Sequence, residues 1–305
     1  MPLKALFNSL DDDKMLKHLT EDEFSRLRQI FLRTYKDLQS CCEKYGLTVI
    51  LLCGTALGAV RHKGFIPWDD DFDVGMTRED FEKLKLIFDK ELGYKYILSS
   101  PNHKGIVKNR FPQVFVKGTT MYEIGSEIGD PLCKIKIDIF IIENAPNSFL
   151  LRCIKGLLCN TSMFIASNVG LYQNKTISLR KYMCKTFKGT MTYVCKRFLG
   201  FLFSFISLQQ WFNIVDRLCM YSKKTNFMCV PTSRGHYFGE IRPSKTFIPF
   251  SVGVFECISV KLPGNTNDYL SHLYGSDYMK IPEETDREKH FICDISFEET
   301  GEDNR

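Results

Sequence analysis

Apolar residues recur with helical spacing near the start of the chain. Thr20 and Glu23 have the spacing of a capping box, and apolar residues then return every three or four positions. We expect this helix to end near Tyr45, with Gly46 just after its last turn, because glycine is the residue preferred there.

A second helix is predicted between runs that are typical of strands. The sequence TRED at residues 77–80 resembles a helix start, and its amphipathic pattern continues to about Gly93. Short runs rich in β-forming residues follow, and we expect strands at residues 96–98, 106–108, 113–117, 121–124 and 135–142. This order of elements predicts an α+β (mixed α/β) fold, with a mixed sheet flanked by helices.

Residues 49–76 combine an apolar run with a cluster of acidic residues. The run 49–53 is typical of a buried strand, and a short helical pattern follows it. Further on, Asp71 and Asp73 alternate with apolar residues, so in an extended strand both carboxylates share one face. Buried carboxylates repel one another unless a cation compensates them. We therefore expect Mg²⁺, or Mn²⁺ in its place, bound by these oxygens together with a substrate phosphate.

Each part of this pattern has a structural interpretation when it is taken alone. An Asp-x-Asp pair is common in solvated turns. A single acid such as Asp138, on an apolar and basic strand, is commonly paired with a lysine. The combination of all three acids with the upstream pair Gly54-Thr55 is what favours a metal site.

The same residues carry a family resemblance. Gly54-Thr55, Asp71-x-Asp73 and Asp138 resemble the three signatures of the nucleotidyltransferase superfamily. The segment GTALGAVRHKGFIPWDDDFDVGMTREDFEKL, residues 54–84, is similar to the hallmark of the LicD family, which includes bacterial phosphocholine transferases and fukutin-like ribitol-phosphate transferases. The similarity is patchier around residues 137–141 and 268–290, and residues 145–230 carry no matching motif.

The resemblance implies a nucleotidyltransferase-like core and a transferase activity. Phosphocholine, or another phospho-alcohol, would move from CDP-choline or a related CDP-alcohol to a hydroxyl of a cell-surface glycan (lipopolysaccharide, teichoic acid or capsule), with release of CMP. We expect Asp71 and Asp73 to bind the metal, with Asp138 as third ligand or as base. The residues expected to bind the donor are Gly54, Thr55, Arg61, Arg110 and Lys117.

Two alternative functions stay open on the sequence alone. One is a true nucleotidyltransferase that releases pyrophosphate, and the other is a non-catalytic glycan-binding relative. A surface salt bridge explains Arg110 and Lys117 as well as a phosphate contact does. Choline itself would require an aromatic cage, for which the candidates are Trp68, Tyr122, Trp211 and Tyr237.

Residues 144–215 differ from the rest of the chain in charge. They contain no aspartate or glutamate but nine lysines and arginines, interleaved with apolar runs. The longest of these runs, Phe198–Leu208, is shorter than the ~20 residues that a membrane-spanning helix needs. We expect residues 149–212 to lie on an anionic membrane surface, close to a lipid-linked acceptor. The alternative is a helical cover for the core, with cations that are solvated or bind the acceptor's phosphates.

Composition and cysteine usage limit the remaining classes. The chain has 305 residues and a formal charge of +5, which is too mild to indicate a nucleic-acid partner. Its 12 cysteines are scattered, without the ligand spacing of a zinc site. The N-terminal residues lack the apolar core of a secretory signal. We therefore expect reduced cysteines in a cytoplasmic protein, peripheral on the inner face of the cell membrane.

These patterns together predict five segments. They are a lead-in (1–18), a nucleotidyltransferase-like catalytic core (19–145), a basic and apolar helical insertion (146–225), a C-terminal part that completes the core and substrate pocket (226–297), and a tail (298–305). In the C-terminal part we expect Asp268 to cap a helix that stops at Tyr274-Gly275, and His290 to be a candidate phosphate contact. A charged cluster, expected to help form the pocket, comprises Arg234, His236, Glu240 and Arg242.

Overall fold

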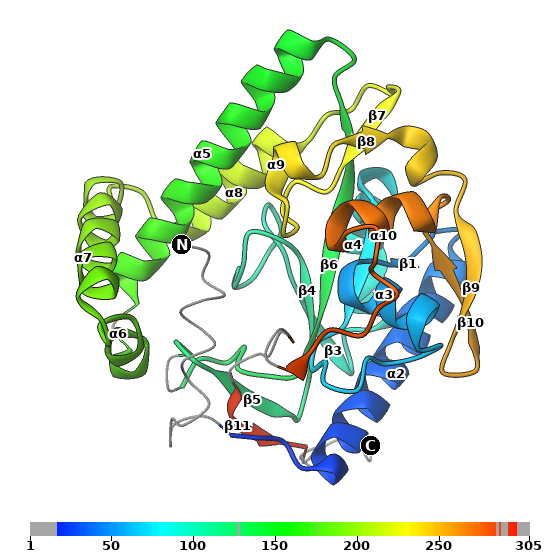
Figure 1. Ribbon diagram of the computed structural model, residues 1–305, viewed down its shortest axis with the longest axis horizontal. Coiled ribbons are helices and arrows are strands. Elements are labelled where there is room, and N and C mark those ends of the chain that lie inside the picture. The colour runs from blue at the N-terminus through cyan, green and yellow to red at the C-terminus, as the bar shows by residue number, and fades with distance from the viewer. Residues whose placement is uncertain (1–16, 127–128, 175, 285–286, 288–291, 298–305) are drawn as a thin grey trace.

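The computed structural model describes residues 17–126, 129–174, 176–284, 287 and 292–297 (Figure 1). Within these residues helices and strands combine in a mixed α+β fold, as the sequence predicts. Most of the lead-in, the whole tail and His290 lie outside the described residues. The five segment boundaries stay predictions.

Helices and strands alternate over the first half of the chain, and helices dominate the middle. The helices are α2 (Glu21–Lys44), α3 (Cys53–Arg61), α4 (Arg78–Glu91), α5 (Phe149–Gln173), α6 (Ile177–Met183), α7 (Phe187–Leu202), α8 (Leu208–Cys219), α9 (His236–Gly239), the 3₁₀ turn η1 (Ser244–Thr246) and α10 (Thr266–Tyr274). The strands are β1 (Ile50–Leu51), β2 (Asp73–Thr77), β3 (Tyr96–Ser99), β4 (Gln113–Val116), β5 (Thr120–Glu123), β6 (Lys136–Ala145), β7 (Phe227–Cys229), β8 (Arg242–Pro243), β9 (Ser251–Phe255), β10 (Ile258–Leu262) and β11 (Ile292–Ser296).

The main sheet has the strand order β1-β2-β6-β4-β3, and β7 and β8 continue from β6. β2 and β6 are parallel, whereas the other pairs are antiparallel, so the sheet is mixed. The β2–β6 register sets Asp73 beside Asp138. Two smaller sheets, β9-β10 and β5-β11, flank the main one.

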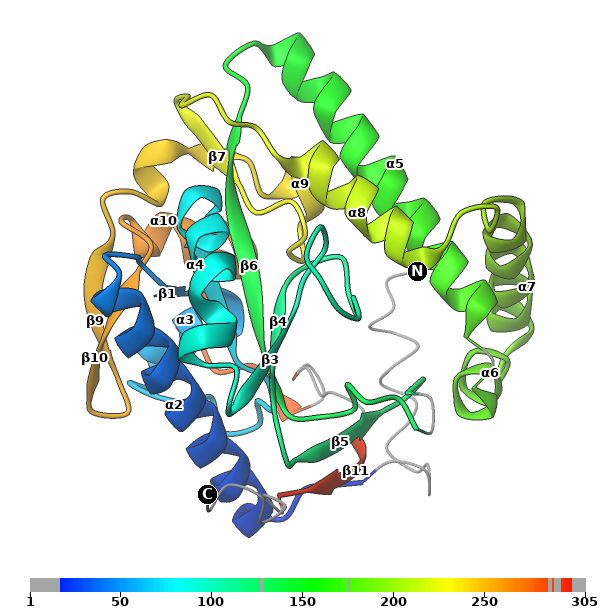
Figure 2. The same ribbon diagram turned by 180° about the vertical axis from the view of Figure 1, so that it is seen from behind.

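Helices cover both faces of the sheet. α3 and α10 lie in front of it in Figure 1, and α2 and α4 lie in front of it in the opposite view of Figure 2. The start of α2 confirms the capping box, since Thr20 and Glu23 bond to each other's backbone amides. Gly46 has a φ of 66° just beyond the end of the helix, which explains the glycine there.

Three predicted details differ from the structure. Only Ile50–Leu51 of the run 49–53 is a strand, and Cys53 already begins α3. β2 begins at Asp73, so Asp71 precedes the strand and the prediction that both share a face of one regular strand is wrong. β1 pairs with β2 over two residues only, and the ladder ends where the chain turns into α3. Residues 106–108 form no strand.

The C-terminal helix is capped differently from the prediction. The side chain of Asn265 accepts the backbone N–H of Asp268 and is the N-cap of α10. The Asp268 carboxylate instead pairs with Arg242 and accepts the Thr246 hydroxyl. The predicted stop is confirmed, because α10 ends at Tyr274 and is followed by Gly275, with a φ of 93°.

The side chains pack into two apolar cores. The larger core surrounds the main sheet and includes Phe72, Val74 and Ile139. The smaller core lies between α5, α8, β7 and α9 and includes Trp211 and Tyr237. All 12 cysteines are free thiols, and six of them are buried in one core or the other.

A buried ionic network joins the two cores at Arg78, the first residue of α4. Its guanidinium pairs with Glu143 of β6 at 2.5 Å and with Asp216 of α8 at 2.7 Å. Burial disfavours the charge, but these two carboxylates raise the pKa of Arg78 above its usual range. Asn102 also bonds to Asp216, so the network connects four separate parts of the chain.

We predict that Arg78→Met destabilises the protein strongly, because Glu143 and Asp216 would stay buried without their cation. Removing one partner of such a network costs about 3–5 kcal/mol. Urea unfolding monitored by circular dichroism measures the loss. Lys83→Met, which breaks an exposed pair with Glu79 on the same helix, should have a much smaller effect. Equal effects of the two substitutions would contradict the role given to Arg78.

Candidate active site

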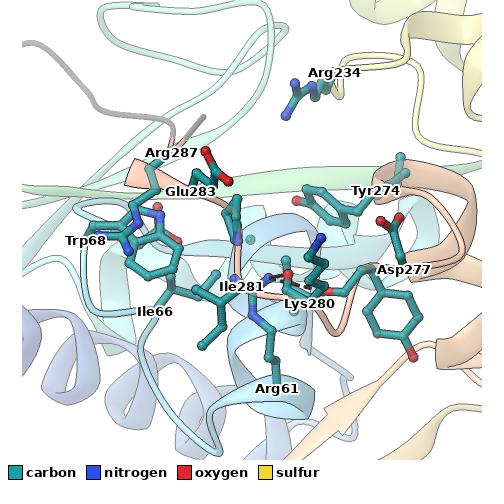
Figure 3. Close-up of a pocket in the computed structure, with 16 residues that line it drawn as sticks. Arg61, Ile66, Trp68, Arg234, Tyr274, Asp277, Lys280, Ile281, Glu283 and Arg287 are labelled. Carbon is teal, nitrogen blue, oxygen red and sulfur yellow. Dashed lines mark hydrogen bonds between the residues drawn. The ribbon is translucent and has the colours of Figure 1, made fainter. Parts of the chain in front are cut away.

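A cavity of about 600 Å³ opens beside the N-terminal half of α3 (Figure 3). Its walls come from α3, the turn before β2, the end of α10 and the segment that follows α10. Two of the predicted donor-binding residues, Gly54 and Arg61, line it. The other lining residues are Leu57, Ile66, Trp68, Asp69, Arg234, Leu273, Tyr274, Asp277, Tyr278, Lys280, Ile281, Pro282, Glu283 and Arg287.

The start of α3 has an unusual backbone. Cys53 has a φ of 46°, in the left-handed region that side chains rarely adopt, and its N–H donates to the Tyr269 hydroxyl at 3.3 Å. A Cβ on Gly54 would lie 3.0 Å from Oδ2 of Asp69, so a glycine lets that carboxylate approach the helix. The positive end of the helix dipole favours negative charge at this position.

Thr55 faces the sheet rather than the cavity. Its hydroxyl oxygen accepts the backbone N–H of Asp73 at 2.8 Å, and its side chain is buried. This bond holds the first turn of α3 against the first residue of β2. The predicted role of Thr55 in binding donor phosphates has no direct counterpart in the cavity lining.

Asp73 and Asp138 are neighbours on parallel strands, and the region around them is buried. Gln113 donates to Asp138 at 2.8 Å. Burial raises the pKa of Asp138 to about 6, although Lys136 and Gln113 oppose the shift. The charge of Asp71 adds to the increase, which indicates that all three predicted acids lie in one electrostatic neighbourhood.

The three acidic residues meet only some of the requirements of a metal site. Among the residues that the structure describes, no three His, Cys, Asp or Glu side chains are grouped closely enough to hold a metal ion. Mg²⁺, however, is commonly bound by one or two carboxylates and completed by water and substrate phosphates. The adjacent pair Asp73 and Asp138 fits that smaller requirement. A buried carboxyl with a raised pKa also gains from a nearby cation.

Arg110 and Lys117 lie beside β4 rather than on it, and neither lines the cavity. Lys117 donates to the carbonyl of Gly93 at 2.5 Å, beyond the end of α4. Burial lowers the pKa of Arg110, and its Nε has no hydrogen-bond partner. His236, whose pKa is lowered by burial and by Arg110, lies near it.

Arg61 lines the cavity and also makes hydrogen bonds that stabilise the structure around it. Its guanidinium donates to the carbonyls of Tyr278 and Lys280 at 3.1 and 3.3 Å. It therefore holds the segment after α10 against α3. Trp68 lies between two cations, with the guanidinium of Arg287 4.2 Å from its ring and that of Arg61 5.8 Å away.

Of the four aromatic candidates, only Trp68 lines the cavity. Trp211 and Tyr237 are buried in the smaller core, where the indole N–H of Trp211 donates to the Phe203 carbonyl. Tyr122 lies on β5, outside the cavity lining.

Tyr274 and Arg234 join the cavity to the acids. Burial raises the pKa of Tyr274 well above its usual range, and the charges of Asp73 and Asp69 raise it further while Arg234 lowers it. Both residues line the cavity, and in Figure 3 Arg234 lies apart from Tyr274, above it in the view. The sequence indicated Tyr274 only as a helix stop, and no spacing pattern signals the position of its hydroxyl.

Glu240 lies behind this wall. Burial raises the pKa of its carboxyl to about 7, although the N–H of Gly235 and the Ser233 hydroxyl oppose the shift. Its charge also raises the pKa of Cys53, at the start of α3, and that of Tyr269 on α10. Of the predicted C-terminal cluster, Arg234 therefore reaches the cavity and Glu240 supports it from beneath.

Glu240 should make the stability of the protein depend on pH. In the folded state the carboxyl keeps its proton up to about pH 7, whereas the unfolded chain loses it near the ordinary value of 4.5. The raised pKa therefore stabilises the fold below pH 4.5, and this contribution is lost as the pH rises towards 7. We predict that Glu240→Gln gains stability over wild type between pH 5 and 8, by roughly 3 kcal/mol at most.

Urea unfolding of both proteins at several pH values measures this difference. The exposed substitution Glu43→Gln controls for the loss of one carboxylate. A difference between Glu240→Gln and wild type that stays constant with pH would contradict the buried, protonated state of Glu240.

Comparison with known proteins finds similarity in the region of the chain that contains these residues. Residues 46–142 match the family model described as LicD/FKTN/FKRP, nucleotidyltransferase domain. The lipopolysaccharide cholinephosphotransferase LicD of Haemophilus influenzae is 26% identical over 258 residues, which cover 82% of this chain and 89% of that protein. Uncharacterized proteins of Rickettsia prowazekii and Rickettsia typhi are 32% and 43% identical over 38% and 20% of this chain, and over 34% and 20% of their own lengths.

The matched region contains α3, β2 and most of β6, and thus Gly54 and the three acids on which the resemblance was based. The match to the Haemophilus protein extends well beyond this region and covers most of both chains. Residues 46–142 are therefore similar to the nucleotidyltransferase domain of the LicD type, and similarity to one LicD protein extends over most of the chain.

Proposed function

We propose that this protein transfers phosphocholine, or another phospho-alcohol, from a CDP-alcohol to a hydroxyl of a cell-surface glycan and releases CMP. The observation that carries the proposal is the 26% identity to a lipopolysaccharide cholinephosphotransferase over 82% of this chain and 89% of that one. Similarity of this extent reaches well beyond the short acidic motif.

The cavity supports a phosphate-bearing donor. Its volume of about 600 Å³ is within the range of pockets that bury small ligands. Four positively charged side chains line the cavity, and positive charge suits a diphosphate. They are Arg61, Arg234, Lys280 and Arg287. Arg234 is our first candidate for the diphosphate contact, because a guanidinium can donate two hydrogen bonds to phosphate oxygens and its charge acts on the neighbouring cavity residue Tyr274, whose pKa it lowers.

The start of α3 provides a second contact for the donor. Because Gly54 has no side chain, a donor phosphate can approach the backbone where the helix dipole favours negative charge. Asp69 is the carboxylate nearest to this position, and a bound phosphate would require it to move away or to be screened.

Asp73 and Asp138, with Asp71 nearby, are the residues that we propose hold Mg²⁺. When bound, the metal would neutralise charge on the donor phosphates and on the departing nucleotide. Asp138 either completes the ligands or accepts the proton of the acceptor hydroxyl. A carboxyl with a pKa of about 6 is mostly ionised at neutral pH and is a suitable base.

The reaction breaks the phosphoanhydride bond of the donor and forms a phosphodiester bond to the acceptor. The acceptor oxygen forms a bond to the phosphorus next to the alcohol, and the bond from that phosphorus to the oxygen bridging to CMP breaks. CMP leaves with the bridging oxygen, and the proton of the acceptor hydroxyl passes to the base. The hydroxyl of Tyr274, a cavity residue whose pKa is raised by the charge of Asp73, would orient the phosphate that is transferred.

The first test measures nucleotide release from CDP-choline, CDP-ribitol, CDP-glycerol and CTP, each with a lipopolysaccharide acceptor. We predict CMP release from one CDP-alcohol that requires Mg²⁺ and is abolished by EDTA. Asp73→Asn should lower the rate at least about a hundredfold, because metal stabilisation of transition-state charge is worth several kcal/mol. The control is Asp89→Asn, because Asp89 lies on α4 in an exposed ion pair with Lys104.

Other products would change the assignment. Pyrophosphate from CTP would support a true nucleotidyltransferase. Binding of lipopolysaccharide without any nucleotide release would support a non-catalytic relative. CMP release that is unaffected by EDTA would contradict the metal part of the proposal alone.

The second test concerns Arg234. We predict that Arg234→Gln raises the KM for the CDP-alcohol at least about tenfold, since a hydrogen bond to a charged group contributes about 1.5–3 kcal/mol. Steady-state kinetics with varied donor measure the effect. Lys245→Gln, an exposed substitution on η1 outside the cavity lining, should leave KM unchanged. An unchanged KM in Arg234→Gln would remove this residue from the donor site.

A further inference from the structure

Helix α7 exposes its apolar face to solvent instead of burying it. Phe187 is 85% exposed at the start of the helix, and Phe205, just after it, is 75% exposed. Between them the exposed apolar residues recur at spacings of three and four, which is the period of one helix face. This outward stripe consists of Phe187, Met191, Val194, Phe198, Phe201, Leu202 and Phe205.

The opposite face of α7 explains this orientation. The residues of α7 that are buried are Gly189 and Gly200. A Cβ at Gly200 would lie 2.1 Å from the carbonyl oxygen of Asn168 on α5, so the two helices meet there backbone to backbone. Glycines thus make the closest backbone contact with α5. Most of the aromatic and aliphatic side chains of α7 are exposed, although the ring of Phe201 also packs on Tyr172 of α5.

A groove runs beside the stripe. It has a volume of about 670 Å³ and is formed by side chains of α5, α6 and α7. Its lining is mostly apolar or aromatic, and Arg180 and Arg197 contribute charge. Figure 1 and Figure 2 show α6 and α7 at one edge of the molecule, on the far side of α5 from the main sheet.

The cations of this region divide into two groups. Arg152, Lys155 and Arg197 donate to backbone carbonyls at helix ends, so their roles are structural. A second group is exposed on α6, on the turn that follows it and at the start of α7, next to Phe187. It consists of Arg180, Lys181, Lys185 and Lys188.

The charge of the segment decides between possible partners. Residues 144–215 contain no carboxylate side chain. If this face packed on the same face of a second copy, like charges would meet, because the segment supplies no carboxylate. An anionic bilayer surface provides both an apolar layer for the stripe and negative head groups for the cations.

We propose that α6 and α7 dock on the surface of an anionic phospholipid bilayer. The stripe of α7 enters the boundary between head groups and acyl chains, and the cations of α6 and the following turn contact the phosphates. Helix α5 is, by length and composition, able to cross a membrane, and only 28% of its most apolar stretch is buried. It nevertheless packs against both α7 and α8 in this fold, which favours an arrangement in which the protein lies on the membrane.

The test is co-sedimentation of the full chain with vesicles, without any substrate, so that it is independent of the proposed activity. We expect binding to phosphatidylcholine vesicles that contain phosphatidylglycerol and little binding to phosphatidylcholine alone. Raising the salt concentration should weaken it. The triple substitution Arg180→Glu, Lys181→Glu and Lys188→Glu should weaken binding at least about tenfold, since each juxtamembrane cation contributes. Met191→Ser, Val194→Ser and Phe198→Ser together should have a similar effect.

Matched variants on other surfaces are the controls. Lys223→Glu, Lys224→Glu and Lys245→Glu change the charge equally, and Val252→Ser with Val254→Ser removes exposed apolar side chains from β9. Both controls should bind as wild type does, and circular dichroism checks that each variant is folded.

Three results would overturn the proposal. They are equal binding to neutral and anionic vesicles, binding that neither α6–α7 variant weakens, and self-association that the stripe variant abolishes in a protein that binds no vesicles. Binding that resists both high salt and alkaline carbonate would replace surface docking by insertion of α5.

Discussion

The parallel pairing of β2 with β6 is the contact on which the arrangement of the site depends. It sets Asp73 beside Asp138, two residues that are far apart in sequence, and it leaves both near the start of α3. Thr55 connects α3 to β2 through one hydrogen bond to the Asp73 amide, so the helix start and the acids move as one unit. The acids are buried beside strands that also form the larger core, which explains the raised pKa of Asp138.

The cavity and the acids are adjacent but not identical. The cavity is formed by the open end of α3, the Trp68 turn and the segment after α10, and the acids lie deeper, against the sheet. Tyr274 connects the two, since it lines the cavity and the charges of Asp73 and Asp69 both raise the pKa of its hydroxyl. This layout suits a substrate that reaches inward, with its polar, phosphate-bearing part near the acids and the rest in the cavity.

The helical middle of the chain is attached to the catalytic half through a few strong contacts. Arg78 pairs with Glu143 and Asp216, and β7 pairs with β6, so α8 is held against the sheet. Helices α6 and α7 lie farther out, where α7 packs on α5 and α6 packs on α7. A firmly attached inner layer with an exposed apolar outer face is consistent with a protein that works next to a surface.

The sequence by itself determined the local elements and the chemistry that they carry. The capping box at Thr20, the start of α4 at Thr77 and the stop at Gly275 follow from short-range hydrogen bonding and backbone preference, and each is found where expected. The three acids could also be selected, because their spacing matches a family signature. Only the tertiary structure decided that Asp71 precedes β2, that Thr55 faces the sheet, and that Tyr274 and Arg234 meet at one cavity. The same is true of α7, whose period indicates a helix but not which face it buries. These features depend on contacts between residues that are distant in the chain, and local periodicity carries no information about them.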